Sequence, residues 1–134
     1  MRDPNKLVVT KQAMELALAV YRLTSDFPSS ERFGLTLQMR RAAVSVGSNI
    51  AEGCGRSGNR EFVRFLQMAR GSSTELAFQL ALSGGLGLGD ASRHEGVAEL
   101  IDHVQRMLNR LTASVRRKIA APRGDGGSAR PPKQ

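Results

Sequence analysis

Apolar residues recur at intervals of three and four along most of the chain, the spacing of one face of an α-helix. In the last long segment six such positions alternate steps of four and three: Val97, Ile101, Val104, Leu108, Leu111 and Val115. Leu100 and Met107 widen this stripe, which is typical of a helix that packs in a bundle. The pattern predicts a helix capped by Asp90 or Ser92 that runs to about residue 121.

Three further helices are predicted from the same spacing. The first covers about residues 11–24 with Thr10 as its N-cap, and the second ends near Gly53, because glycine often ends a helix. The third covers about residues 59–83, and its seam consists of Phe62, Phe65, Ala69, Ser72, Leu76 and Gln79. Together these elements predict an all-α fold, an up-down four-helix bundle.

The two ends of the chain lack this periodicity. Residues 1–9 are expected to form an N-terminal arm, and the segment 122–134, rich in Pro and Gly, a disordered basic tail. The four-helix bundle is therefore expected to span residues 10–121. No apolar run approaches the 18 residues of a membrane-spanning helix.

A longer motif joins the second helix to the third. It reads RRAAVSVGSNIAEG from Arg40, then Gly55-Arg56, then EFxRFLxxAxGSxxELxxQL from Glu61 to Leu80. This motif resembles the small four-helix-bundle proteins encoded in intervening sequences of bacterial 23S ribosomal RNA genes. The accessory variability proteins of diversity-generating retroelements are similar bundles, and the likeness runs from about residue 11 to residue 115.

The resemblance implies three properties besides the fold. One is assembly into a ring of five, a homopentamer. Another is association with nucleic acid, and the third, for the retroelement relatives, is a reverse transcriptase as partner. Independently of the resemblance, a surplus of apolar and small positions on the third and fourth helices predicts a closed oligomer.

Polar residues mark a second face of the helix that ends near Gly53. Arg41, Ser45, Ser48 and Glu52 stand at i, i+4, i+7 and i+11 and so share one side. The sequence predicts a structural polar layer within or between subunits, made of Arg40, Arg41, Ser45, Ser48, Asn49, Glu52, Glu75 and Gln79. In this layer Glu75 is expected to pair with Arg40 or Arg41 largely out of water; the alternatives are a ligand site and a solvated Glu75.

The net charge of +8 is unevenly distributed. Residues 32–70 carry seven arginines against two glutamates, and residues 106–134 carry eight bases against one acid. Residues 71–105 instead have one base and five acids. Sixteen of the twenty basic residues are arginine, which suits bidentate pairing with phosphate. This distribution indicates an anionic partner.

Two clusters of bases are expected to meet, because an up-down bundle brings the start of the third helix and the end of the fourth to one end. The predicted nucleic-acid-binding residues are Arg56, Arg60, Arg64, Arg110, Arg116, Arg117 and Lys118, with Arg123, Arg130 and Lys133 in the tail. Because no recognition-helix motif is present and aromatic residues are few, RNA or DNA would be bound through phosphates with weak sequence selectivity. The alternatives are a solvated rim and a structural oligomer that docks a protein partner.

The residues of enzyme chemistry are scarce. Cys54 is the only cysteine, which fits a reducing cytoplasm and excludes an internal disulfide. His94 and His103 are expected on the exposed side of the last helix; His103 with Glu99 at i, i+4 is more consistent with a solvated face than with a metal site. The glycine-rich stretch 84–90 lacks the GK[ST] of a phosphate loop and predicts a turn. We expect no enzyme, no cofactor and no metal.

Overall fold

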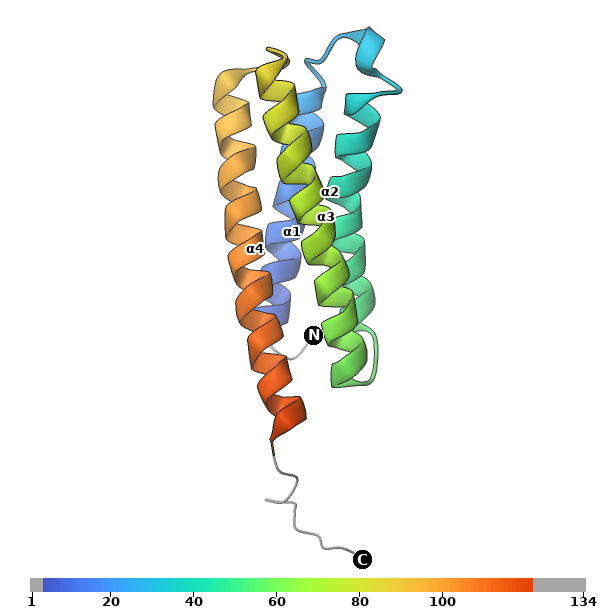
Figure 1. Ribbon diagram of the computed structural model, residues 1–134, viewed down its shortest axis with the longest axis vertical. Coiled ribbons are helices and arrows are strands. Elements are labelled where there is room, and N and C mark those ends of the chain that lie inside the picture. The colour runs from blue at the N-terminus through green and yellow to red at the C-terminus, as the bar shows by residue number, and fades with distance from the viewer. Residues whose placement is uncertain (1–3, 122–134) are drawn as a thin grey trace, which may run out of the picture.

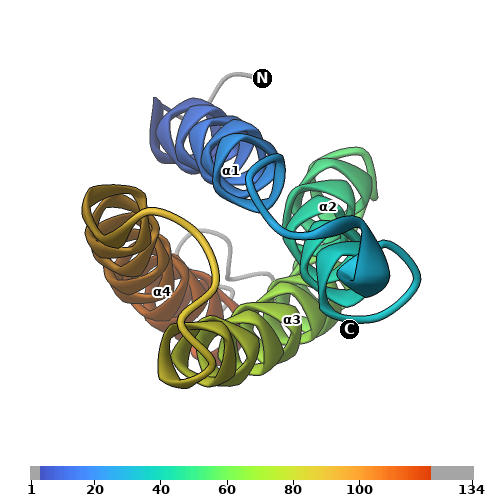
Figure 2. The ribbon, with the colours of Figure 1, turned by 90° about the horizontal axis from the view of Figure 1, so that it is seen from above.

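The computed structural model describes residues 4–121, and in this part of the chain four long helices stand side by side (Figure 1). The elements are α1 (Pro4–Thr24), the short 3-10 helix η1 (Ser29–Glu31), α2 (Leu35–Cys54), α3 (Asn59–Gly85) and α4 (Ala91–Ala120). Seen from above, α1 and α3 occupy opposite corners, and each packs against both α2 and α4 (Figure 2). The predicted up-down four-helix bundle is confirmed.

The core consists of the positions that the helical spacing selects. All six residues of the α4 stripe are at most 5% exposed. Along α3 the seam is buried except for half-buried Ser72. Leu100 and Met107 are half-buried and pack against the core, so α4 uses its whole apolar stripe inside the subunit.

Large apolar side chains left at the surface of the described chain lie on α3, as expected, but also on α1 and α2 and not on α4. Within residues 4–121 the exposed large apolar residues belong to α1, α2, α3 and the connections, and none to α4. Leu7, Met14 and Leu18 share one side of α1, and Leu37 and Val44 share one side of α2. The predicted surplus on α4 is wrong, because the two-residue width of its stripe is taken up by contacts with both α1 and α3.

The first helix begins earlier than predicted. Helix α1 begins at Pro4. Proline has no backbone N–H, but the N–H groups of the first helical turn have no partner within the helix, and the fixed φ of proline suits that turn. Val9 is fully buried, and the Thr10 hydroxyl donates to the carbonyl of Lys6 at 2.7 Å instead of capping a helix start. Residues 1–3 and the predicted tail 122–134 lie outside the described residues.

Two acidic side chains begin helices. The Asp90 carboxylate accepts hydrogen bonds from the backbone N–H of Arg93 at 3.0 Å and the hydroxyl of Ser92 at 2.7 Å, so Asp90 is the cap of α4. These two bonds lower the pKa of Asp90, the Ser92 hydroxyl most of all. Before α2, the Glu31 carboxylate accepts from the N–H of Leu35 at 3.1 Å.

The alternating helix directions define two ends of the bundle. The start of α1, the α2–α3 turn and the end of α4 lie together at the end that we call the basic end (Figure 1). The other end, which we call the loop end, carries η1 and the α3–α4 connection. Within residues 4–121 no helix combines the length and apolarity needed to cross a membrane.

Two glycines allow close packing. Gly89 in the α3–α4 connection has φ +79°, and a Cβ there would lie 2.8 Å from Cδ1 of Leu23. Near the end of α2, a Cβ on Gly53 would lie 2.8 Å from the Cβ of Phe65 and 3.0 Å from Cδ1 of Phe62. At Gly47, in contrast, a Cβ would meet only the Cβ of Ala13 among the described residues outside its own helix, at an ordinary 3.7 Å.

This difference predicts opposite effects of the same substitution. Gly47→Ala should raise the free energy of unfolding by about 0.5–1 kcal/mol, because alanine favours the helix and its methyl group has room. Gly53→Ala should lower it by about 1–3 kcal/mol, because α3 must move away. Urea denaturation of both variants measures the two changes, and equal signs would contradict the assignment of the close contact to Gly53.

Candidate nucleic-acid interface

The predicted basic clusters lie at the same end of the molecule. Arg56, Arg60 and Arg64 belong to the α2–α3 turn and the first turns of α3. The other cluster (Arg110, Arg116, Arg117 and Lys118) occupies the last turns of the neighbouring helix α4. Figure 1 shows that both segments reach the basic end.

Two of the arginines are held by nearby acids. Arg56 contacts the Glu52 carboxylate at 2.9 Å, and Arg64 contacts that of Glu61 at 3.3 Å. Both guanidinium groups also lie over the Phe65 ring, at 5.2 and 4.8 Å from its centroid. These exposed pairs contribute little to stability, but they reduce the charge that the two arginines present to a ligand.

The remaining bases of the two clusters supply most of the positive charge at the basic end. Arg60, Arg110, Arg116, Arg117 and Lys118 are exposed, and within the described chain none of them forms an ion pair. Arg117 and Lys118 also complement the negative end of the helix dipole of α4.

Recesses flank the last turns of α4 on both sides. Toward α1 lies a cavity of about 330 Å³ lined by Asn5, Met107, Arg110, Leu111, Ser114 and Arg117. Toward α3 lies one of about 150 Å³ lined by Gln67, Arg70, Asn109, Thr112, Ala113 and Arg116. Sequence reasoning missed Arg70, because it stands outside the four-residue repeat of Arg56, Arg60 and Arg64. Arg70 stands six residues after Arg64 and next to the buried seam, and this position could have indicated it.

Part of the predicted polar layer comes together between α2 and α3. The hydroxyls of Ser45 and Ser72 share a hydrogen bond of 2.8 Å, and Asn49 Nδ2 donates to the carbonyl and the hydroxyl of Ser45. Gln79 is buried, and its Oε1 has no hydrogen-bond partner within the described residues. Ser48 is exposed and lies apart from this group.

The charged members of the layer are placed differently from the prediction. Glu75 and Arg41 are exposed, and neither forms an ion pair in residues 4–121, so the predicted buried pair is wrong. Both side chains line a surface recess on α2 and α3 instead. At that edge the two charges keep their hydration, which burial would remove at high cost.

Arg40 turns toward α1. Its Nε donates to the hydroxyl of Thr24 at 2.8 Å, Nη2 donates to the carbonyl of Tyr21 at 3.5 Å, and the guanidinium lies 4.4 Å from the centroid of the Tyr21 ring. Thr24 is buried, and its hydroxyl donates a hydrogen bond to the carbonyl of Val20. Arg40 therefore links α1 to α2 near the loop end.

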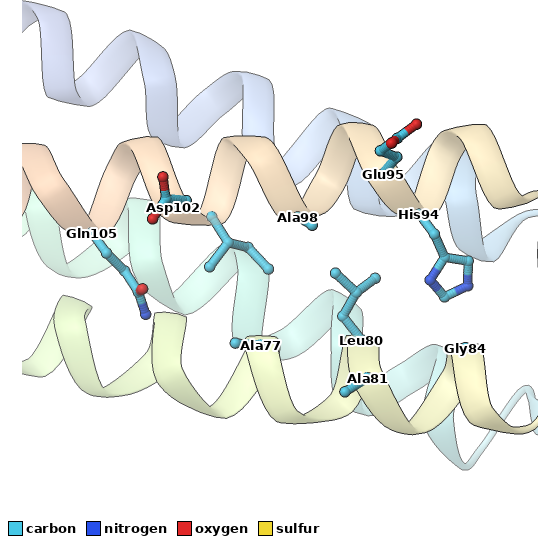
Figure 3. Close-up of a pocket in the computed structure, with 10 residues that line it drawn as sticks. Ala77, Leu80, Ala81, Gly84, His94, Glu95, Ala98, Asp102 and Gln105 are labelled. Carbon is cyan, nitrogen blue, oxygen red and sulfur yellow. The ribbon is translucent and has the colours of Figure 1, made fainter.

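A separate groove between α3 and α4 lies nearer the loop end (Figure 3). Its volume is about 540 Å³, and small side chains leave it open: Ala77, Ala81, Gly84 and Ala98 stand beside Leu80 and Ile101. Glu95 and Asp102 of α4 also line it, and in Figure 3 their carboxylates turn away from α3. An apolar groove with acidic neighbours does not favour a phosphate.

His94 lies at one end of this groove and is half-buried rather than exposed as predicted. Its Nε2 lies 2.7 Å from the carbonyl oxygen of Leu88, and because a carbonyl only accepts, Nε2 carries the proton. Within residues 4–121 no group of three His, Cys, Asp or Glu side chains is placed to hold a metal ion. His103 and Glu99 both lie exposed on α4.

The fold is similar to that of a solved protein of unknown function, a member of the S23 ribosomal protein family from Bacteroides thetaiotaomicron. The TM-score is 0.75 at 19% sequence identity, over 81% of this chain and 98% of that one. Residues 5–110 match the 23S rRNA-intervening sequence protein family, and the chain therefore belongs to that family. No curated protein matches the chain. The family predicted from the motif is confirmed, and the link to retroelement accessory proteins stays a prediction.

Adjacent arginines offer a matched test of the polar contacts. Arg40→Ala should lower the free energy of unfolding by about 1–2 kcal/mol, because it removes the bond to Thr24 and the stacking on Tyr21. Arg41→Ala should change it by less than about 0.5 kcal/mol, because that side chain is exposed and unpaired. Chemical denaturation of the two variants decides, and an equal effect of both would contradict the assignment.

Proposed function

We propose that this protein is a non-enzymatic, oligomeric accessory protein of the cytoplasm that binds nucleic acid through phosphate contacts at its basic end. The observation that carries the proposal is the gathering of Arg60, Arg110, Arg116, Arg117 and Lys118 without acidic partners in the described chain. A surplus of like charge at one end costs folding free energy through repulsion, and a polyanion relieves it. The resemblance to retroelement accessory proteins adds a reverse transcriptase as a candidate partner.

The chemistry of this end favours phosphate recognition over base reading. Arginine binds phosphate oxygens in a bidentate manner. Phe62 and Phe65, the aromatic rings of the first turns of α3, are buried, and Phe65 lies beneath Arg56 and Arg64, so neither ring offers bases a stacking platform at the surface. Binding should therefore be weakly selective for sequence, and RNA and DNA are both candidates.

Phosphate binding predicts a steep dependence of affinity on salt. In a plot of the logarithm of the binding constant against the logarithm of the salt concentration, each phosphate that the protein neutralises should add about 0.7–0.9 to the steepness of the slope. Arg116→Ala combined with Arg117→Ala should therefore lower the slope by about 1–2, and removal of residues 122–134 should lower it further. Fluorescence anisotropy with labelled RNA and DNA over a range of salt concentrations measures the slope.

The matched control removes charge at the loop end. Arg22→Ala combined with Arg32→Ala takes away the same two charges from exposed positions far from the basic end. The slope of this variant should stay close to that of the parent. Immeasurable affinity of the parent at about 50 mM salt, where phosphate contacts are strong, or equal slopes for both double variants, would refute the proposal.

Self-association is the second part of the proposal. The apolar stripes on α1 (Leu7, Met14, Leu18) and α2 (Leu37, Val44) are exposed among the described residues of the subunit, and exposed apolar surface of this kind supports an interface between copies. By family resemblance the oligomer is a ring of five. A ring would bring five basic ends together into one field.

The oligomer predicts a mass of about five subunits of 14.5 kDa in solution. Leu18→Glu should release subunits that keep their helical circular dichroism, because the side chain is 46% exposed in the single subunit. Leu86→Glu, at 58% exposure on the α3–α4 connection, is the control and should leave the mass unchanged. Multi-angle light scattering checks both, and a single subunit mass for the parent at micromolar concentration contradicts the assembly.

A second function is supported by the same apolar stripes: a structural oligomer that docks a protein partner without contacting nucleic acid itself. The exposed apolar residues of α1 and α2 are not among the residues that line the recesses beside the end of α4. In that case Leu18→Glu abolishes partner capture while the salt-dependent retention on RNA or DNA is absent from the parent.

A further inference from the structure

The recess of about 150 Å³ between α3 and α4, which we call the arginine notch, combines donors from both helices. Gln67 and Arg70 stand one turn apart on α3, and Asn109, Thr112 and Arg116 follow one side of α4 at i, i+3 and i+7. Ala113 adds a short side chain and leaves room. The notch lies toward the basic end, and its volume is well below the ~300–1,000 Å³ of pockets that enclose whole small molecules. It therefore fits an anionic group and not a complete nucleotide.

The charges of the notch are uncompensated. Arg70 and Arg116 are exposed, neither forms an ion pair within residues 4–121, and no acidic residue lines the recess. Elsewhere on the described surface arginines do find acids: Arg93 pairs with Asp26, and Arg106 pairs with Asp102 one turn from the notch. Two guanidinium groups on facing helices repel each other unless an anion lies between them.

The neutral side chains of the notch supply matching donors. The amides of Gln67 and Asn109 and the hydroxyl of Thr112 offer N–H and O–H groups beside the two guanidinium groups. A phosphate has several acceptor oxygens and can use donors from several directions, whereas a carboxylate has two oxygens in one plane.

The site is held in shape by hydrogen bonds directly above it. Gln105 Nε2 donates to Ser73 Oγ at 3.0 Å, and the Ser73 hydroxyl donates to the carbonyl of Arg70 at 2.7 Å. This chain of bonds ties α4 to α3 beside Arg70, so the two helices keep their separation before a ligand arrives. Above it begins the apolar groove, whose lining includes Glu95 and Asp102 and, within the described residues, no arginine or lysine.

We propose that the arginine notch binds one phosphate group of a nucleic-acid backbone, with Arg70 and Arg116 as its charged ligands and Gln67, Asn109 and Thr112 as its neutral donors. This inference rests on the proposed function and adds to it a defined site on the side of the bundle. Because the two arginines hold the same phosphate, their contributions to affinity are coupled rather than independent.

The first test separates a built site from a diffuse positive field by changing the notch without changing its charge. With labelled poly-uridylate RNA and the full chain, Gln67→Ala and Thr112→Val should each weaken binding by roughly two- to tenfold, the value of one hydrogen bond. Gln38→Ala removes the same exposed amide from α2 and should have no effect. Arg70→Lys keeps the charge but loses the forked donor set, and should bind more weakly than the parent. If binding depended only on the overall positive charge, none of these variants would change the affinity for RNA.

The coupling of the two arginines gives a second test that uses the same measurement of RNA affinity. Arg70→Ala and Arg116→Ala should each weaken RNA binding by roughly three- to tenfold, and the double variant by less than the product of the two. Arg32→Ala at the loop end is the control for loss of one charge. Strict additivity, together with no effect of Gln67→Ala and Thr112→Val, overturns the notch while the steep salt dependence of the parent keeps the proposed function.

The third test needs no nucleic acid. In NMR spectra of the full chain, inorganic phosphate at constant ionic strength should shift the side-chain amide signals of Gln67 and Asn109 saturably, whereas those of Gln38 should stay in place. Equal shifts with chloride alone overturn the site. Saturable phosphate shifts combined with absence of RNA binding overturn the assignment to nucleic acid and, with it, the proposed function.

Discussion

The contact of Gly53 with Phe62 and Phe65 is the one on which the basic end depends. A methyl group at Gly53 would approach the Cβ of Phe65 to 2.8 Å, so only glycine lets the end of α2 and the start of α3 meet this closely. That approach is what allows the residues between Cys54 and Asn59 to reverse the chain. It also buries the Phe65 ring under Arg56 and Arg64, which places the first basic cluster on the surface of the turn.

Periodicity was sufficient to predict the core, because a buried stripe depends only on residues of one helix. Val97 through Val115 are buried at the predicted positions, and Asp90 caps α4 as its residue type favours. Helix starts were predicted less well: the N-terminal arm was expected to reach residue 9, although Pro4 fits the first turn of a helix. The spacing of side chains along one helix does not say which neighbouring helix each one faces, and this explains the remaining differences.

Arg40 and Glu75 illustrate that limit. Both occupy positions beside a buried seam, and the sequence offers no register between α2 and α3 that fixes how their long side chains extend. Arg40 reaches α1, where Thr24 and Tyr21 satisfy it, and Glu75 remains in water. Short side chains differ in the same way: Ser45 meets Ser72 of α3 through a 2.8 Å hydrogen bond, whereas Ser48, predicted in the same layer as Ser45, is exposed. The same limit hid the arginine notch, since Arg70 and Arg116 belong to different helices.

Helix electrostatics accounts for only part of the charge pattern on α4. Apart from Arg93, acids stand in its first half and bases in its second, and this order complements the helix dipole. The dipole acts within the first and last turns, however, so it explains Arg117 and Lys118 but not Arg110, which lies two turns earlier, or Arg70, which belongs to α3. Repulsion among these groups opposes folding, and within the described residues no acid offsets it. The solubility of a small protein requires net charge but not its concentration beside polar recesses on two flanks of one helix. The proposed anionic partner would supply the missing counter-charge, and the placement of these bases is the strongest physical argument for it.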